Sequence, residues 1–392
     1  MPNNKMADLV LLMKYRHILT KHVEAEIQKT LPDKFALVMD GWTATNSSYF
    51  VALFATFPSK DVEIGYETVL LTFSPLLIER RSREEHQELI KYALDLYGKS
   101  AENVVAITAD NCKLNQCIAD HIDIPMVGCA IHRFILAVQG YINKHKDLIQ
   151  KVHNLMFAFK ISLKLRDKLA LYTPLAPIPM SGTCWLSVAD MLARYNELRE
   201  FLHHFETEAY VLEYSSPSFK IPDAKENKVL SDLHVEFQSL KSITLALQAQ
   251  STDMVAVRML FDGALSKFPN LDEKSLYLSP DSEIVHSPHF EAGLVKIQDG
   301  RERDLRAQEK IACRALRFNR KSATDDAEAA SAEKENDFAT EILQKRVKVQ
   351  KSEFMDTRFV LPTSNVAERF FSQAGIAYND LRKSLSPVNL EE

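Results

Sequence analysis

The sequence predicts a mixed α/β fold, because strand-like and helix-like segments alternate over its first third. Apolar segments rich in β-branched and aromatic residues predict strands at 35–39, 48–57, 63–73, 104–107 and 125–130. Apolar residues at three- and four-residue spacing predict helices at 82–98, 112–121 and 131–142. The first three strands follow one another closely, which favours antiparallel pairing, whereas helices separate the later strands, which favours parallel pairing. We therefore expect one mixed sheet flanked by helices.

Individual elements carry local signals of their own. The continuous apolar runs 35–39 and 104–107 predict central strands that are covered on both faces. The helix at 82–98 has Ser82 at its start, Glu85 three residues later and Gly98 at its end. This pattern is typical of a capping box and of a glycine stop. Near the end of the chain, 359–361 predicts a short strand before a last helix.

The second half of the chain is almost wholly helical in its pattern up to about residue 318, with proline-rich breaks at 174–179 and 216–222. An acidic, alanine-rich stretch follows and predicts a linker. We expect five parts: an N-terminal helical segment (1–32), the first part of the α/β domain (33–143), a helical insertion (144–321), the acidic linker (322–341) and the C-terminal part of the α/β domain (342–392).

Composition limits the class of protein. The 392 residues fit about two or three domains. They contain no apolar run of about 18 residues, so we expect no membrane partner. Five cysteines in this length favour a reducing compartment.

The net charge of −5 argues against a protein that coats nucleic acid over its whole surface. Between residues 144 and 168, however, seven basic residues stand against two acidic ones, and between 301 and 321 eight stand against three. Each stretch alone is typical of a solvated helix face. Together they leave room for a DNA-binding surface, with Lys160, Lys164 and Lys168 as its candidate contacts.

Two aspartates follow the two central strands. Asp40 ends the first apolar run, and Asp110 follows the run at 104–107. Sites in open α/β sheets gather at the carboxyl ends of the strands, so both carboxylates should meet at one edge. Two like charges there favour a hard divalent cation, Mg²⁺ or Mn²⁺. Two such ions could clamp an in-line phosphoryl displacement.

Each acidic residue also has an ordinary structural interpretation. Asp40 and Gly41 form a dipeptide that is common in hairpin turns. Asp110 could cap the helix that follows it. Glu368 lies three residues after Asn365, which is the spacing of a capping box.

Four potential zinc ligands fall within a short span: Cys112, Cys117, Cys129 and His132. Their spacing is not that of a common zinc finger. Buried cysteine acting as a small apolar residue is the favoured alternative.

Five segments resemble marker segments of a known family: "DGWT" (40–43), "TADN" (108–111), "CAIH" (129–132), "TCWLS" (183–187) and "SNVAERFFSQAG" (364–375). They are similar, in the same order, to those of the hAT superfamily of cut-and-paste DNA transposases. The resemblance implies an RNase H-like mixed sheet flanked by helices and interrupted by a large all-helical insertion. It also implies metal-dependent DNA strand cleavage and transfer in the nucleus of a eukaryotic cell.

The resemblance also assigns residues. Asp40, Asp110 and Glu368 match the family's catalytic acidic triad, which holds two Mg²⁺ or Mn²⁺ ions. His132 matches the histidine of a C-x-x-H segment near the active site, where it would contact DNA. Trp185 matches a tryptophan that stacks on a flipped base, an interaction that offsets part of the cost of extruding the base. The C-terminal region matches a dimerisation region, which implies a homo-oligomer.

Some family features have no counterpart in the sequence. Residues 1–32 hold no cysteine that would form the family's N-terminal zinc finger, and no further apolar helix follows 386–392. Cys184 replaces an arginine that often precedes the tryptophan, and Ile135 replaces an asparagine. The alternative expectation is therefore a non-catalytic, transposon-derived protein that binds DNA and dimerises.

Overall fold

The computed structural model describes residues 3–44, 47–59, 65–76, 82–182, 185–205, 220–318 and 352–377. The chain divides into two compact units. The sheet unit comprises Met1–Cys129, Gln250–Arg258 and Ile284–Glu392, and the helical unit comprises Ala130–Ala249 and Met259–Glu283. The helical unit therefore starts before the predicted boundary at residue 144, and 284–318 belongs with the sheet. The predicted acidic linker at 322–341 lies outside the described residues.

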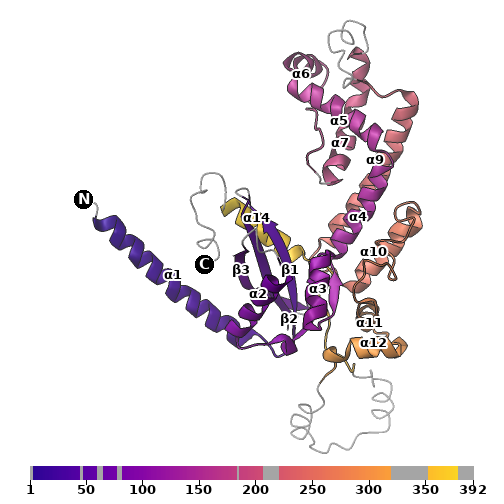
Figure 1. Ribbon diagram of the computed structural model, residues 1–392. Helices are drawn as coiled ribbons and strands as arrows, with labels where there is room; N and C mark the ends of the chain where they lie inside the picture. The colour runs from indigo at the N-terminus through magenta and orange to yellow at the C-terminus, as the bar shows by residue number, and fades with distance from the viewer. Residues whose placement is uncertain are drawn as a thin grey trace, which may run out of the picture. The chain divides into compact units, whose positions relative to one another are not determined.

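The sheet unit is built on a mixed five-stranded sheet, as predicted (Figure 1). Its strands are β1 (Phe35–Thr43), β2 (Tyr49–Pro58), β3 (Tyr66–Leu76), β4 (Val104–Ala109) and β5 (Met126–Gly128). The strand order is β3-β2-β1-β4-β5. β2 pairs antiparallel with β1 and β3, whereas β4 pairs parallel with β1 and β5. The sequence thus predicted both the α/β class and the strand directions correctly.

Helices cover both faces of this sheet. The sheet unit contains α1 (Asn3–Thr30), α2 (Arg83–Leu96), α3 (Lys113–Ile122), α11 (Pro288–Gln298), α12 (Ala307–Ala312), α14 (Asn365–Ala377) and the short 3-10 turns η2 (Ala101–Asn103), η4 (Glu302–Asp304) and η5 (Arg314–Leu316). Phe35 and Leu37 of β1 pack with α2 and α3 in one apolar cluster. Ala36 and Val38, which point the other way, pack with α11 and α14 in a second cluster. This double burial explains why β1 reads as a continuous apolar run.

The predicted cap of α2 is present. Ser82 is the N-cap residue, and its hydroxyl accepts a hydrogen bond from Glu85 N at 3.4 Å. No described helix is long and apolar enough to cross a membrane.

The helical unit packs its helices without a sheet among its described residues. It contains α4 (Ala130–Asn143), α5 (Lys146–Ile161), α6 (Leu163–Ala170), α7 (Trp185–Leu198), η3 (Arg199–Phe205) and α9 (Ala224–Leu247), and it shares α10 (Met254–Lys267) with the sheet unit along the chain.

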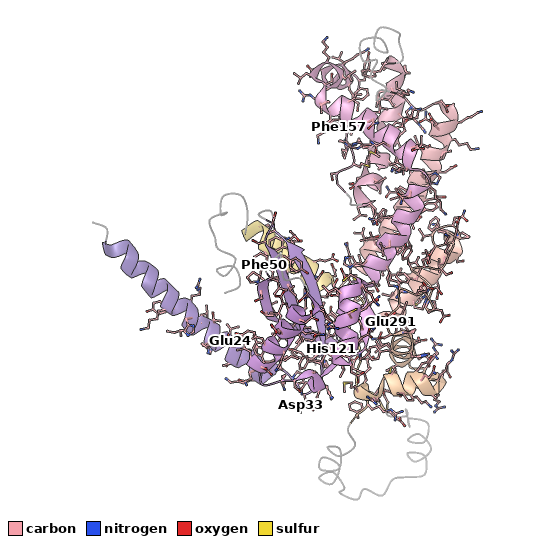
Figure 2. The ribbon with its side chains drawn as sticks, viewed as in Figure 1. Glu24, Asp33, Phe50, His121, Phe157 and Glu291 are labelled. Atoms are coloured by element: carbon pink, nitrogen blue, oxygen red, sulfur yellow. The ribbon has the colours of Figure 1, made fainter. Side chains whose placement is uncertain are left out.

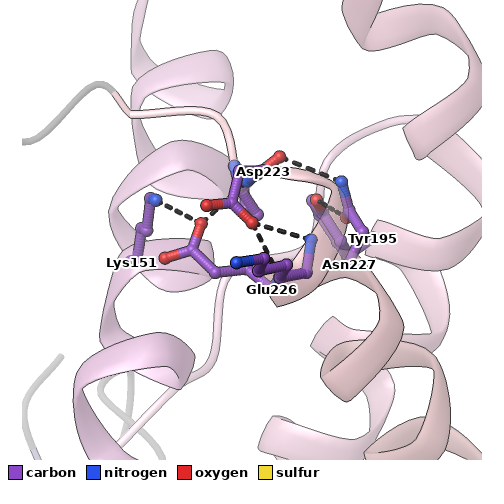
Figure 3. A network of polar contacts seen from close by, with 7 residues as sticks. Lys151, Tyr195, Asp223, Glu226 and Asn227 are labelled. Atoms are coloured by element: carbon purple, nitrogen blue, oxygen red, sulfur yellow. Dashed lines mark hydrogen bonds and ion pairs between the residues drawn. The ribbon is translucent and has the colours of Figure 1, made fainter.

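A polar network joins three helices of the helical unit (Figure 3). Asp223 and Glu226 form a capping box at the start of α9. Glu226 also accepts a 2.6 Å hydrogen bond from Lys151 Nζ of α5. The hydroxyl of Tyr195 of α7 donates to Asn227 Oδ1 at 2.6 Å. The hydrogen bond from Lys151 lowers the pKa of Glu226, so this carboxylate is charged at neutral pH.

Candidate functional site

Asp40 and Asp110 lie at the same edge of the sheet. In the parallel pairing of β1 with β4, Val38 is opposite Thr108. Each aspartate follows its member of that pair by two residues, so the two positions are neighbours on adjacent strands. Asp110 directly follows β4, whereas Asp40 lies inside β1, toward its carboxyl end. The hairpin interpretation of Asp40 is wrong, because β1 continues through Asp40, opposite Ala52, to Thr43.

Asp110 also organises the start of α3. Its Oδ1 accepts hydrogen bonds from Cys112 N at 3.2 Å and from Asn115 Nδ2 at 2.5 Å. Cys112, not Asp110, occupies the N-cap position of α3. Burial raises the pKa of the Cys112 thiol to about 11, and the Asp110 carboxylate contributes to this rise. Asp110 therefore has a local structural role as well as its place at the edge.

The segment before α14 crosses the sheet as irregular backbone, so the strand predicted at 359–361 is wrong. Thr56 of β2 donates its hydroxyl to Phe359 O, and Thr108 of β4 donates to Leu361 O, each at 2.7 Å. β1, β2 and β4 already have strands on both sides, so threonine hydroxyls satisfy the carbonyls of this segment. Ser364 then donates from N and Oγ to Cys129 Sγ, each at 3.4 Å.

These contacts bring Glu368 to the carboxyl edge. Cys129 follows β5, and its N–H donates to Ala109 O at the end of β4 at 2.8 Å. A carboxylate oxygen of Glu368 lies within 4.8 Å of Cys129 Sγ. The first turn of α14 bonds to Ser364 O, from Ala367 N at 2.9 Å and from Glu368 N at 3.4 Å. Ser364 is thus the capping residue, and Glu368 lies one position beyond that of a capping box.

The three acidic residues do not close around one point. Among the described residues, no group of three or more ligands able to hold an ion includes Asp40 or Asp110. Cys112 and Cys117 also join no such group, so the alternative zinc module of four ligands is not assembled. His132 lies in the first turn of α4, in the helical unit.

Aromatic side chains fix α14 on the sheet. Phe371 stacks on Trp42 of β1, with ring centroids 6.1 Å apart. Phe370 meets Phe73 of β3 edge to face at 5.0 Å, and Phe73 stacks on Phe50 of β2 at 4.8 Å. Phe50 is labelled on the sheet in Figure 2. No motif in the sequence marks this cluster, although the pair "FF" on an amphipathic helix is a usable signal. It holds the helix that carries Glu368.

Trp185 does not present its ring to solvent. The side chain is 2% exposed and packs edge to face against Phe237 of α9, with centroids 6.4 Å apart. Stacking on a flipped base would require uncovering the ring. Cys184, which directly precedes Trp185 in the sequence, lies outside the described residues.

The three candidate lysines differ in their surroundings. Lys160, at the end of α5, and Lys164, on α6, are exposed. Lys168 is half-buried: its Nζ donates to His204 O at 2.9 Å and lies 4.8 Å from the ring centroid of Phe205. Lys168 therefore also joins α6 to η3.

A second polar cluster lies at the amino end of β4, beside a cavity of about 470 Å³. His286 contacts Asp120 Oδ1 through Nε2 at 2.9 Å and Ser287 Oγ through Nδ1 at 3.0 Å. Ser287 Oγ also accepts from Met126 N at 3.1 Å. Asp120, His286, Ser287 and Met126 are linked to one another by these contacts. The cluster therefore joins α3, β5 and the start of α11. Sequence spacing gave no signal for it.

Comparison with known proteins adds no assignment. No family model and no curated protein sequence matches the chain. Two features of the molecule bear on its function: the edge of the sheet near Asp40, Asp110 and Glu368, and the surface of the helical unit.

Proposed function

We propose that the chain is a hAT-type transposase, or a protein derived from one, with an RNase H-like fold and metal-dependent DNA strand cleavage and transfer. One observation carries the proposal: two aspartates lie in register toward the carboxyl ends of adjacent parallel strands, and a helix packed on the same sheet brings a glutamate to that edge. The strand order and directions described above also support it.

The donor set suits Mg²⁺ or Mn²⁺ in its chemistry. Asp40, Asp110 and Glu368 offer hard carboxylate oxygens, which these ions prefer. Two ions bound there would stabilise the attacking and leaving oxygens of a phosphodiester. Because the three residues do not form a closed ligand group, binding of the ions must draw the carboxylates together.

The remaining parts of the proposal concern partners. The basic stretch with Lys160, Lys164 and Lys168 would contact DNA backbone phosphates. The C-terminal region would mediate a homo-oligomer, and a eukaryotic protein of this kind would act in the nucleus. Of the C-terminal region, the described part is 352–377.

A second function, non-catalytic DNA binding and dimerisation, is favoured by one observation. Asp110 Oδ1 already accepts two hydrogen bonds from its own chain, and the three acidic residues are not grouped. In a protein that has lost catalysis, the aspartate would remain for its structural role at the start of α3.

Nicking of single-stranded and pre-nicked DNA in Mn²⁺ separates the two functions. We expect activity in the wild type and its loss in Glu368→Gln, because the neutral amide is a poor ligand for a hard ion. Glu88→Gln, an exposed change on α2, is the matched control and should keep full activity. Full activity in Glu368→Gln would refute the triad assignment, and an inactive wild type would favour the non-catalytic function.

A further inference from the structure

Three aromatic rings lie in contact in the helical unit, two of them stacked and the third tilted. Tyr172 follows α6, and His203 and His204 belong to η3. The rings of Tyr172 and His204 are nearly parallel, with centroids 3.8 Å apart and an angle of 6°. His203 approaches His204 at 3.7 Å and 43°. His204 is thus the shared member, and both other rings reach solvent, Tyr172 with 40% of its surface exposed.

Lysines of α5 and α6 accompany this stack. Lys168 joins α6 to η3 through its bond to His204 O. Lys164 lies one turn before Lys168 on the same face of α6, and Lys160 lies at the end of α5. Both Lys160 and Lys164 are exposed. The segment 144–168 carries seven basic and two acidic residues in a chain with a net charge of −5. This local excess of positive charge is complementary to a polyanion.

We propose that the surface formed by Tyr172, His203, His204, Lys160 and Lys164, the ring-stack surface, binds single-stranded nucleic acid. Every base has a π-face, so unpaired bases can extend an existing stack of rings whatever their sequence. The exposed Lys164, one turn before Lys168, and Lys160 at the end of α5 would neutralise phosphates and release counterions. Bases in a duplex are already stacked on one another, so a single strand is favoured. The inference goes beyond cleavage at the sheet edge, since a non-catalytic protein would keep it.

A lipid surface fits these residues less well. Leu163 and Leu171 are 63% and 79% exposed, which also suits an apolar partner. A helix that lies in a membrane interface, however, separates a charged face from an apolar face. Lys164 of α6 lies on the same side as Leu171, the C-cap residue two turns further along the chain. The helix is also only eight residues long.

Fluorescence anisotropy with a labelled oligothymidylate tests the proposal on the full chain. We expect Tyr172→Leu and His203→Ala each to weaken binding by about tenfold, because each removes a stacking face. Tyr172→Phe keeps the ring and should bind as the wild type does. Tyr92→Leu, an exposed tyrosine change on α2, is the matched control. Unchanged binding in Tyr172→Leu, or weakened binding in Tyr172→Phe, would overturn the stacking role.

Salt and competitors complete the test. The double variant Lys160→Gln, Lys164→Gln should lower the slope of log Kd against log salt by about 1.4, since single strands release about 0.7 counterions per neutralised phosphate. Lys228→Gln, an exposed change on α9, should leave the slope unchanged. Binding is measured in EDTA, without divalent cations, so a failure of the proposed cleavage leaves it unchanged and is distinguishable. Equal affinity for duplex DNA and for the single strand would contradict the inference. So would binding to anionic phospholipid vesicles that is stronger than binding to the single strand and that Leu171→Gln abolishes.

Discussion

The carboxyl edge of the sheet and the ring-stack surface are built in opposite ways. Asp40, Asp110 and Glu368 are far apart in the sequence, and strand register and buried contacts bring them to one edge. The members of the ring-stack surface come from two short stretches, 160–172 and 203–204, and most are exposed. Substitutions in the distant packing contacts should therefore disturb the arrangement of the three acidic residues. Binding by the ring-stack surface should be insensitive to those substitutions and should depend on the side chains of the surface itself.

The largest expected effect concerns the packing of α14. Phe371→Ala removes an 8% exposed ring from the aromatic cluster and should lower the free energy of unfolding of the sheet unit by about 3–5 kcal/mol. Chemical denaturation measures this. Ile376→Ala, on the same helix but 74% exposed, should change stability by less than about 0.5 kcal/mol. Equal effects of the two changes would contradict the packing of α14 described here.

A smaller loss should follow removal of one hydroxyl. Thr108→Val leaves the buried Leu361 O without its 2.7 Å hydrogen bond and should cost about 1–3 kcal/mol. Because this bond precedes the turn into α14, Mn²⁺-dependent nicking should fall as well, while binding of oligothymidylate should not change. Parallel loss of both activities would show that the two regions are not separable.

The sequence predicted those parts of the fold that depend on local pattern. Periodicity and the spacing of the runs predicted the strands and their directions, and predicted that Asp40 and Asp110 lie on or beside neighbouring strands. Asp110 follows its strand as expected, but Asp40 lies inside β1, which continues to Thr43. The strand predicted at 359–361 is absent because the carbonyls of Phe359 and Leu361 accept hydrogen bonds from threonine hydroxyls of β2 and β4. No local sequence pattern indicates contacts with such distant residues. The burial of Trp185 and the stack of Tyr172 with His204 likewise depend on contacts between separate helices.

Binding to single strands should depend on pH through the ring stack. Burial, with the neighbouring His203 and Lys168 charges, lowers the pKa of His204, so this ring is neutral at neutral pH and gains a proton only at lower pH than an ordinary histidine. Protonation adds positive charge, so affinity should rise as the pH falls below the range in which an ordinary histidine titrates. His204→Phe keeps a ring without titration and should flatten this part of the profile. An identical pH dependence of binding in the wild type and in His204→Phe would show that His204 does not contribute to binding.

The smallest effect reports on the charge of Asp110. Cys112 is an exposed residue, yet desolvation of its thiol raises the pKa to about 11, so alkylation by iodoacetamide should be slow at pH 8. Asp110→Asn removes one contribution to that pKa and should speed alkylation severalfold. Peptide mass spectrometry can follow Cys112 separately from the half-buried Cys117. No change in rate would mean that the Asp110 carboxylate does not act on this thiol.

Calorimetric titration of Mn²⁺ tests the central claim, that the carboxyl edge is a site for hard divalent cations. We predict that the wild type binds Mn²⁺ and is stabilised by about 2.7 kcal/mol at a concentration one hundred times Kd. The double variant Asp40→Asn, Asp110→Asn should lose the binding, and Cys129→Ser should retain it. A wild type that does not bind millimolar Mn²⁺, or that instead holds stoichiometric zinc lost in Cys129→Ser, would contradict the account.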